Sequence, residues 1–202
     1  MDAPLSIFRP LANLTGYDIV LASASPRRRE LLDLLDIPFR VDTSYSVDET
    51  VPEGMAAEEI PAYLSSLKAS AYPIAAGEKK IVIGADTIVI LDGKVLGKPS
   101  DLPSAVRMLA SLQGKTQRVI TGVTVRTAGL TKTFSAESQV DFGTLSPEEI
   151  AYYVERYRPL DKAGAYGIQE WIGAAAISGI RGSFYNVMGL PVHRLYQALK
   201  EI

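Results

Sequence analysis

The segment at residues 81–90, IVIGADTIVI, is the most hydrophobic part of the chain and holds only one charged residue, Asp86. Its β-branched and nearly continuous apolar residues predict a central strand of a sheet. An unpaired carboxylate in such surroundings would cost several kcal/mol or would take up a proton. Because a buried charge needs a partner or a ligand, we treat Asp86 as a candidate functional residue.

Other segments place strands and helices around this central strand. The apolar run at 17–23 predicts a first strand, and Ser25 followed by Pro26 predicts the N-cap and first position of a helix. Asp92 and Gly93 predict a hairpin turn. The remaining segments are predicted as a strand at 38–45, an acidic loop at 46–54, helices at 56–72 and 101–112, a hairpin at 117–127 and 131–142, a helix opened by a capping box at 146–149, a glycine-rich stretch at 162–189 and a helix from about Pro191.

Hairpins and strand-helix units occur together, which predicts an α/β or α+β fold around a mixed sheet. The 202 residues, 47% of them hydrophobic, suffice for the core of one domain. The chain contains no repeat, low-complexity linker or block of like charge. We therefore expect a single domain over residues 1–202, in which residues 1–16 form an N-terminal extension.

The composition narrows the chemistry open to the chain. The absence of cysteine excludes disulfides and thiol nucleophiles, and the one histidine, His193, falls in the last predicted helix, where a lone imidazole is more often a surface or packing residue. The 21 basic and 23 acidic residues give no broad positive field for nucleic acid, and no apolar run could span a membrane or serve as a secretory signal. We expect a soluble cytoplasmic protein with a small-molecule ligand.

The corner between the first strand and the first helix, Ser23 to Arg29, has the character of an anion site. A helix N-terminus offers free N–H groups, and the hydroxyl of Ser23 with the guanidinium groups of Arg27 and Arg28 adds groups suited to a polyphosphate. The alternative is a capped helix with solvated arginines. Cations in a first helical turn oppose the helix dipole at a small cost, and the sequence alone leaves both interpretations open.

Asp86 could hold a metal ion together with Asp48 or Glu49, because Mg²⁺ prefers carboxylate oxygens and phosphates can complete its octahedron. Lys68 and Lys98 could neutralise charge on a phosphoryl group, although isolated lysines are usually solvated. The glycine-rich segment from Asp161 to Gln169 allows close approach of the backbone to a ligand, and the Gln169 amide can pair with the edge of a base. A plain loop is the competing interpretation.

Taken together, these segments resemble the Maf family of nucleotide pyrophosphatases from about Ile19 to Leu199. The resemblance implies a mixed twisted sheet flanked by helices, with a cleft between two lobes, similar to the inosine triphosphate pyrophosphatases. Family members are often homodimers. The matching stretches, which occur in the family's order, are Leu21 to Arg28, Gly84 to Thr87, Gly97 to Pro99, Asp161 to Gln169 and Gly189 to Pro191.

The resemblance also implies an activity, the conversion of a nucleoside triphosphate to its monophosphate and pyrophosphate. Mg²⁺ or Mn²⁺ would be held by Asp86 and Glu49, and Asp86 would orient or deprotonate the attacking water. Arg28, Lys68 and Lys98 would hold the triphosphate, with a hydroxyl from Ser23.

Within the family, Arg27, Thr87 and Gln169 look like the branch that acts on dTTP and UTP. The branch acting on 7-methyl-GTP and a nucleotide-binding regulator of septum formation are the alternatives.

Two features depart from the family pattern. Glu170 and Trp171 follow Gln169 where glycine is common. An extra residue before Glu49 leaves both Asp48 and Glu49 as matches to the family's acidic position, and we choose Glu49.

Overall fold

The computed structural model describes residues 10–202, and one sheet of seven strands runs through them. Its strand order is β2-β1-β3-β5-β6-β7, with β4 also paired to β3. β1 runs parallel to both of its neighbours, and all other pairs are antiparallel, so the predicted mixed α/β class is confirmed. The strands are β1 (Asp18–Leu21), β2 (Arg40–Val41), β3 (Lys80–Leu91), β4 (Lys94–Leu96), β5 (Thr116–Arg126), β6 (Thr131–Phe142) and β7 (Ile177–Arg181).

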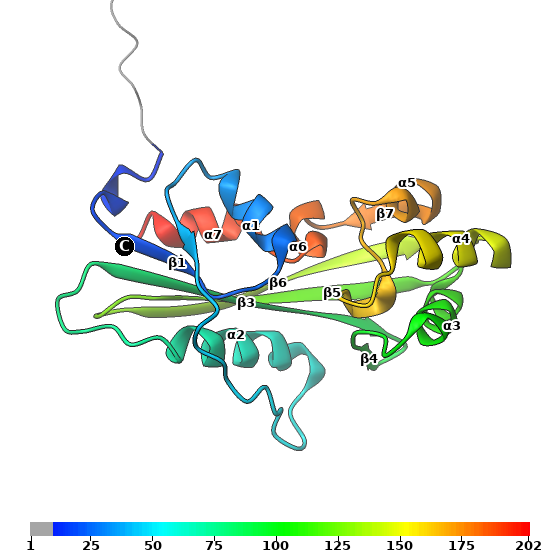
Figure 1. Ribbon diagram of the computed structural model, residues 1–202, viewed down its shortest axis with the longest axis horizontal. Coiled ribbons are helices and arrows are strands. Elements are labelled where there is room, and N and C mark those ends of the chain that lie inside the picture. The colour runs from blue at the N-terminus through cyan, green and yellow to red at the C-terminus, as the bar shows by residue number, and fades with distance from the viewer. Residues whose placement is uncertain (1–9) are drawn as a thin grey trace, which may run out of the picture.

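Helices cover both faces of the sheet (Figure 1). The first and last α-helices lie on one face and α2 lies on the opposite face, while α3 packs against α4 toward the far end of the long strands. No described helix is long and apolar enough to cross a membrane. The helices are α1 (Pro26–Asp33), α2 (Ile60–Ser70), α3 (Leu102–Leu112), α4 (Pro147–Tyr157), α5 (Trp171–Ala176), α6 (Phe184–Met188) and α7 (Val192–Leu199), with short 3-10 turns η1 (Ala12–Leu14), η2 (Ala57–Glu59) and η3 (Ala163–Ala165).

The central strand β3 contributes side chains to the cores on both faces. Ile81 and Ile83 pack into the cluster formed with α1 and α7, whereas Val82 packs with the end of α2. Since side chains alternate along a strand, Asp86 falls on the α2 side and Thr87 on the α1 side. Asp86 and Thr87, although adjacent in the sequence, therefore present their polar groups to different helices.

One edge of β3 is paired at both ends and open between them. β1 pairs with β3 as far as Ile83, and β4 pairs with it from Val89 onward. Along the other edge, β5 pairs with β3 from Val82 to Ile90 without a break. Within the described residues, the stretch from Gly84 to Ile88 has no strand beside it on the β1 edge. Both faces of this stretch therefore border the unpaired part of the edge, which we call the opening.

Two glycines let α2 approach the sheet closely. A Cβ on Gly84 would lie 2.3 Å from the carbonyl oxygen of Ser65, and one on Gly122 would lie 2.2 Å from the backbone of Pro61. Gly122 is the β5 partner of Asp86 in the ladder. Contact of backbone with backbone at these points brings the α2 residue Lys68 down to the level of β3.

Three predicted segments differ from the structure. The strand expected at 38–45 is only two residues long, because Asp42 folds back to accept hydrogen bonds from the backbone and hydroxyl of Ser44 at 2.9 and 2.6 Å. The helix expected at 56–72 begins as a 3-10 turn, and Pro61 lies in the first turn of α2. The glycine-rich stretch at 162–189 contains α5, β7 and α6, with Gly182 at positive φ between β7 and α6 and Gly189 at positive φ after α6.

The N-terminal extension predicted at residues 1–16 falls partly outside the described residues. From residue 10 onward, Leu11 and Leu14 are buried in the same core as α7, and the Asn13 amide donates to the carbonyl oxygen of Leu199 at 2.8 Å. Residues 10–16 therefore pack with the fold, and the limits of the domain stay a prediction.

We predict that Gly122→Ala destabilises the protein, because the added methyl group must push α2 away from the sheet. The expected loss is about 1–3 kcal/mol or more of unfolding free energy, measured by urea denaturation. Gly129→Ala is the matched control, since nothing lies within 4 Å of its added Cβ. Equal stability of the two variants would contradict the close packing.

Candidate active site

Arg28 lies at the base of the open edge of β3 and makes three hydrogen bonds. Its Nε donates to the Gly189 carbonyl at 2.9 Å, and its terminal nitrogens donate to the hydroxyls of Ser23 at 3.3 Å and Thr87 at 3.1 Å. Thr87 is in turn 2.9 Å from the Thr121 hydroxyl. All three acceptors are neutral, and within residues 10–202 no carboxylate forms an ion pair with Arg28.

The charge of Arg28 is therefore held without a direct counter-ion. Burial lowers the pKa of its guanidinium, and the nearby charge of Asp86 opposes that shift. A partly buried cation with neutral acceptors gains free energy when an anion arrives, because the anion supplies the missing charge in a site of low dielectric. This geometry favours the anion site over the solvated arginines that the sequence left as an alternative.

Lys68 joins two carboxylates on the other face of the opening. Its Nζ lies 2.7 Å from Asp86 Oδ1 and 3.0 Å from Glu49 Oε2. Asp48 instead accepts hydrogen bonds from the backbone and hydroxyl of Thr50 and does not reach Lys68. The structure thus brings Glu49, and not Asp48, to Asp86.

The donor set suits a divalent cation that also binds phosphate. Two carboxylates that reach one ammonium group can also converge on one ion, and Mg²⁺ is commonly held by one or two carboxylates plus substrate phosphates. The described residues contain no group of three or more acidic or histidine side chains that would form a complete protein cage. Asp86 and Glu49 would therefore hold the ion only as part of a shell shared with a ligand.

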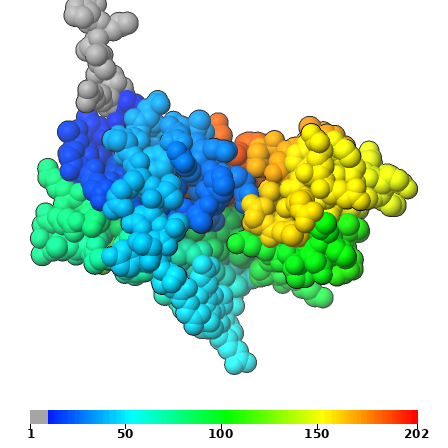
Figure 2. All heavy atoms as spheres, viewed as in Figure 1, coloured from blue at the N-terminus to red at the C-terminus, as the bar shows by residue number. Residues whose placement is uncertain are grey.

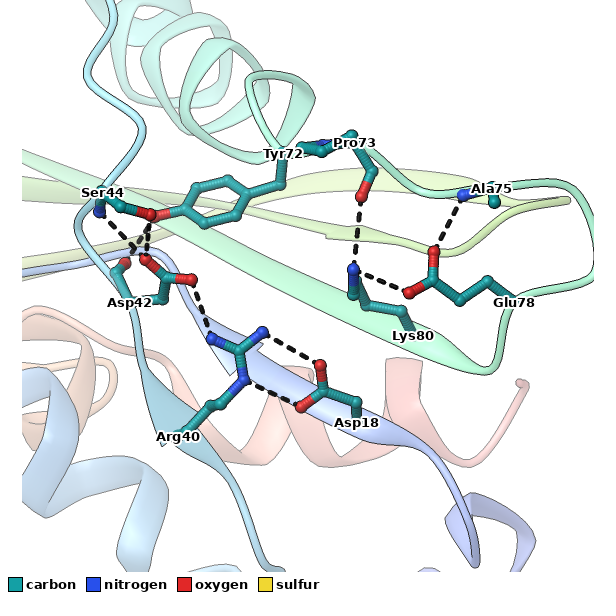
Figure 3. Close-up of polar contacts among 9 residues, drawn as sticks. All are labelled: Asp18, Arg40, Asp42, Ser44, Tyr72, Pro73, Ala75, Glu78 and Lys80. Atoms are coloured by element: carbon teal, nitrogen blue, oxygen red, sulfur yellow. Dashed lines mark hydrogen bonds and ion pairs between the residues drawn. The ribbon is translucent and has the colours of Figure 1, made fainter.

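The segment that leads to Glu49 is attached to the same helix that carries Lys68. The hydroxyl of Tyr72, just after α2, donates to the carbonyl of Asp42 (Figure 3). The Tyr72 ring also lies 4.8 Å from that of Tyr45. On the opposite side, Arg40 pairs with Asp42 and with Asp18 of β1 (Figure 3). These contacts hold the start of the acidic loop against α2 and β1.

Arg27 reaches across the opening to the glycine-rich segment. Its guanidinium lies 2.7 Å from Asp161, whose other oxygen lies 2.8 Å from the buried Lys162 ammonium. Burial raises the pKa of Asp161, but hydrogen bonds from Lys162 and Arg27 outweigh it and lower the pKa to about 2. In Figure 2 the blue N-terminal part and the yellow segment near residue 160 accordingly lie side by side.

Two adjoining cavities, of about 160 and 400 Å³, occupy the opening. The larger one is of a size typical for small ligands. The cavities share most of their charged lining, whereas Asp86, Lys162 and apolar side chains from β3, β5, α6 and the glycine-rich segment line the smaller cavity alone. The shared charged residues are Arg27, Arg28, Glu49, Lys68, Lys98 and Asp161.

The remaining predicted site residues also border these cavities. Asp86, Thr87 and Gln169 line the smaller cavity, and Ser23 lines the larger one. Gln169 and Lys98 are exposed, and neither side chain forms a hydrogen bond or ion pair with the described residues. The chosen set of site residues thus lies at one opening, whereas Asp48, the alternative to Glu49, does not line it.

Sequence reasoning nominated the segment from Asp161 to Gln169 for its backbone, but it assigned no role to the side chains of Asp161, Lys162 or Glu170. Lys162 is 7% exposed and lies between Asp161 and Glu170, with its Nζ 3.2 Å from Glu170 Oε1. No local pattern reveals such pairs, because a lysine beside an aspartate is usually a solvated surface feature. The contact of Arg27 with Asp161 spans 134 residues of sequence.

The fold and the opening define a class of site: a cleft at a sheet edge in which cations and two carboxylates face an apolar wall, as binding of a phosphorylated small molecule with a metal ion requires. The Maf-like protein family matches residues 18–202, and the chain belongs to this family.

Close relatives carry a functional name. The chain is 53% identical over 192 residues to a dTTP/UTP pyrophosphatase of Bacteroides thetaiotaomicron, covering 95% of this chain and all of the relative. It is 53% identical over 193 residues to a dTTP/UTP pyrophosphatase of Porphyromonas gingivalis, covering 95% of this chain and 97% of the relative. A solved HAM1 protein of Coxiella burnetii is a distant structural likeness, with a TM-score of 0.49, 16% identity and coverage of 92% and 100% of the two chains.

We predict that Asp161→Asn lowers stability near neutral pH and that the loss shrinks in acid. A carboxylate with a lowered pKa contributes stability above its ordinary value of 3.8 and loses it as the pH falls through about 2. Urea denaturation of wild type and variant at about pH 6 and about pH 3 measures this difference. Asp33→Asn, at an exposed position without an ion pair in the described chain, is the control. A difference that grows on acidification would contradict the assignment.

Proposed function

We propose that the protein is a metal-dependent nucleoside triphosphate pyrophosphatase that hydrolyses dTTP and UTP to the monophosphate and pyrophosphate. One observation carries the proposal. The cluster of Lys68, Asp86 and Glu49 faces Arg28, whose hydrogen-bond acceptors are all neutral, across a single opening. The arrangement supplies cations for a polyphosphate and carboxylates for a metal ion and a water molecule. The names of the close relatives support the substrate class.

The proposed reaction is attack of water at the α-phosphorus. A new bond forms from the water oxygen to this phosphorus, the bond from phosphorus to the oxygen bridging to the β-phosphate breaks, and pyrophosphate leaves. Arg28, Lys68 and Lys98 hold the phosphates and offset charge as it develops, which is the main contribution that a protein makes to such transfers. Ser23 adds a hydroxyl beside Arg28.

Asp86 has the position to accept the proton of the attacking water. It projects into the opening from a rigid strand, and Lys68 fixes the orientation of its carboxylate. A divalent cation, when bound to Asp86 and Glu49, supplies positive charge that polarises the phosphate oxygens. The Arg27 guanidinium, held by Asp161, lies where it can meet the outer part of the substrate.

We place the base of the substrate in the smaller, partly apolar cavity. Gln169 at its rim can give one hydrogen bond and accept another, which complements the O4 and N3–H groups of uracil and thymine. Cytosine presents an amine and an unprotonated nitrogen at the same places. The proposed substrate is drawn from the nucleotide pool, so the expected location stays cytoplasmic, and the homodimer stays a prediction.

Release of pyrophosphate, detected with a coupled inorganic pyrophosphatase, tests the function on a panel of canonical triphosphates and 7-methyl-GTP with and without Mg²⁺ or Mn²⁺. We expect metal-dependent hydrolysis with dTTP and UTP preferred. Preference for 7-methyl-GTP would assign the other branch of the family. Tight nucleotide binding without turnover would indicate a regulator instead of an enzyme.

We predict that Asp86→Asn folds normally and lowers kcat by at least about a hundredfold, the scale of losing a general base or a metal-held charge. The control is Asp92→Asn in the exposed turn between β3 and β4. Activity near that of wild type in folded Asp86→Asn would remove this carboxylate from the mechanism.

We also predict that Gln169→Ala narrows the preference for UTP over CTP, by about tenfold in the ratio of kcat/KM values, while metal dependence is kept. A site built to pair with one base leaves groups unpaired when the wrong base binds, and removing the amide removes that penalty. An unchanged ratio would show that other groups read the base.

A further inference from the structure

Glu170 departs from the glycine that the family resemblance implies at its position, and its side chain does not cap the helix that it begins. It is the N-cap residue of α5 but makes no capping hydrogen bond. Its carboxylate turns back over the glycine-rich segment instead. One oxygen accepts a hydrogen bond from the Tyr153 hydroxyl, and the other lies 3.2 Å from Lys162 Nζ.

Tyr153 closes a small ring of hydrogen bonds around the residues that precede Glu170. Its hydroxyl accepts from the Gly167 backbone N–H at 3.0 Å while it donates to Glu170. The Glu170 backbone N–H donates to the Gly167 carbonyl at 3.0 Å. Burial and the hydrogen bond to Glu170 raise the pKa of the Tyr153 hydroxyl, so it remains a proton donor. In the sequence, Gln169 lies between Gly167 and Glu170, the two residues that this ring joins.

The packing within the ring is tight. A Cβ on Gly167 would lie 2.8 Å from the Glu170 carboxylate, so that carboxylate rests on the backbone of the turn. Tyr153 is fully buried, and Ile168, next to Gln169, is 6% exposed. The residues on either side of Gln169 are therefore held by packing and hydrogen bonds, although the Gln169 side chain itself is exposed.

The ring continues into the phosphate side of the site as a chain of alternating charges. Glu170 contacts Lys162, Lys162 contacts Asp161, and Asp161 contacts Arg27 of α1. The two cations and two anions balance, which a largely buried lysine requires. This chain connects the residue beside Gln169 to the helix that holds the phosphates.

We infer that Glu170, with Tyr153, is a positioning residue that holds the Gln169 backbone in one orientation and thereby sets the discrimination between bases. The inference rests on the proposed function in that Gln169 reads the base. A loose backbone would let the Gln169 amide approach a base from several directions and pair with either pyrimidine, whereas a fixed backbone restricts it to one approach that leaves the mismatched base with unpaired groups.

Tyr153→Phe tests this inference directly, because it removes only the hydroxyl oxygen of a buried side chain and keeps the aromatic group and its packing. The expected result is a fall of about three- to tenfold in the ratio of kcat/KM for UTP to that for CTP. The inhibition constant of inorganic tripolyphosphate, which has no base, should stay within about twofold of wild type. Glu170→Ala should lower the UTP-to-CTP ratio to a similar extent. Glu170→Gln, which keeps an acceptor for the Tyr153 hydroxyl, should retain most of the wild-type ratio.

Tyr152→Phe and Glu155→Ala are matched controls at adjacent exposed positions of α4 and should leave the ratio unchanged. An unchanged ratio in folded Tyr153→Phe and Glu170→Ala would overturn the inference. So would a loss of tripolyphosphate inhibition equal to the loss of activity, because this would indicate general damage to the site.

Hydrogen exchange of the backbone separates failure of the inference from failure of the proposed function. Tyr153→Phe should speed exchange at residues 167–170 and not in the sheet, whereas Tyr152→Phe should change neither. If wild type does not prefer UTP to CTP, the proposed base preference fails, and exchange alone then decides whether Glu170 and Tyr153 hold the segment. Unaltered exchange at residues 167–170 would overturn the positioning role.

Discussion

The pairing of β3 ends on one edge at Ile83 and resumes at Val89, and within the described residues no strand lies beside the residues between them on that edge. A strand normally sends neighbouring side chains to opposite faces, where they serve separate cores. At an open edge both faces border one space. Asp86 and Thr87 can therefore act on the same ligand while the strand stays rigid through its unbroken pairing with β5.

The charges of the site depend on how closely the helices approach this edge. Gly84 and Gly122 let α2 rest on the sheet backbone, which places Lys68 within 2.7 Å of Asp86. On the other face α1 begins immediately after β1 and carries Arg28 to Thr87. The carboxylates are thus paired before any ligand binds, whereas no carboxylate of residues 10–202 forms an ion pair with Arg28. This difference favours an anionic ligand near Arg28. The two carboxylates can then exchange the Lys68 ammonium for a metal ion.

The sequence predicted most of the fold because local patterns decided it. The central strand, both hairpins and the capping box of α4 follow from periodicity and turn residues, and each is confirmed. Burial of a charge also singled out Asp86 by a physical argument. Lys68 and Lys98 became candidates only through the family resemblance, because nothing local distinguishes a site lysine from a solvated one. The short elements at 171–188 were missed, since their glycines resemble those of an irregular loop.

Contacts between distant segments were beyond prediction for a different reason. The chain of charges from Glu170 to Arg27 joins α1 to the glycine-rich segment, and no periodicity relates residues so far apart. Yet a departure from the family pattern marked one end of it, since a charged residue stands at Glu170 where glycine is common. In a glycine-rich segment that needs freedom of backbone, an added carboxylate carries a cost unless it finds a partner. Lys162 and Tyr153 are those partners, and through them Glu170 comes to have the positioning role that we infer for the Gln169 backbone.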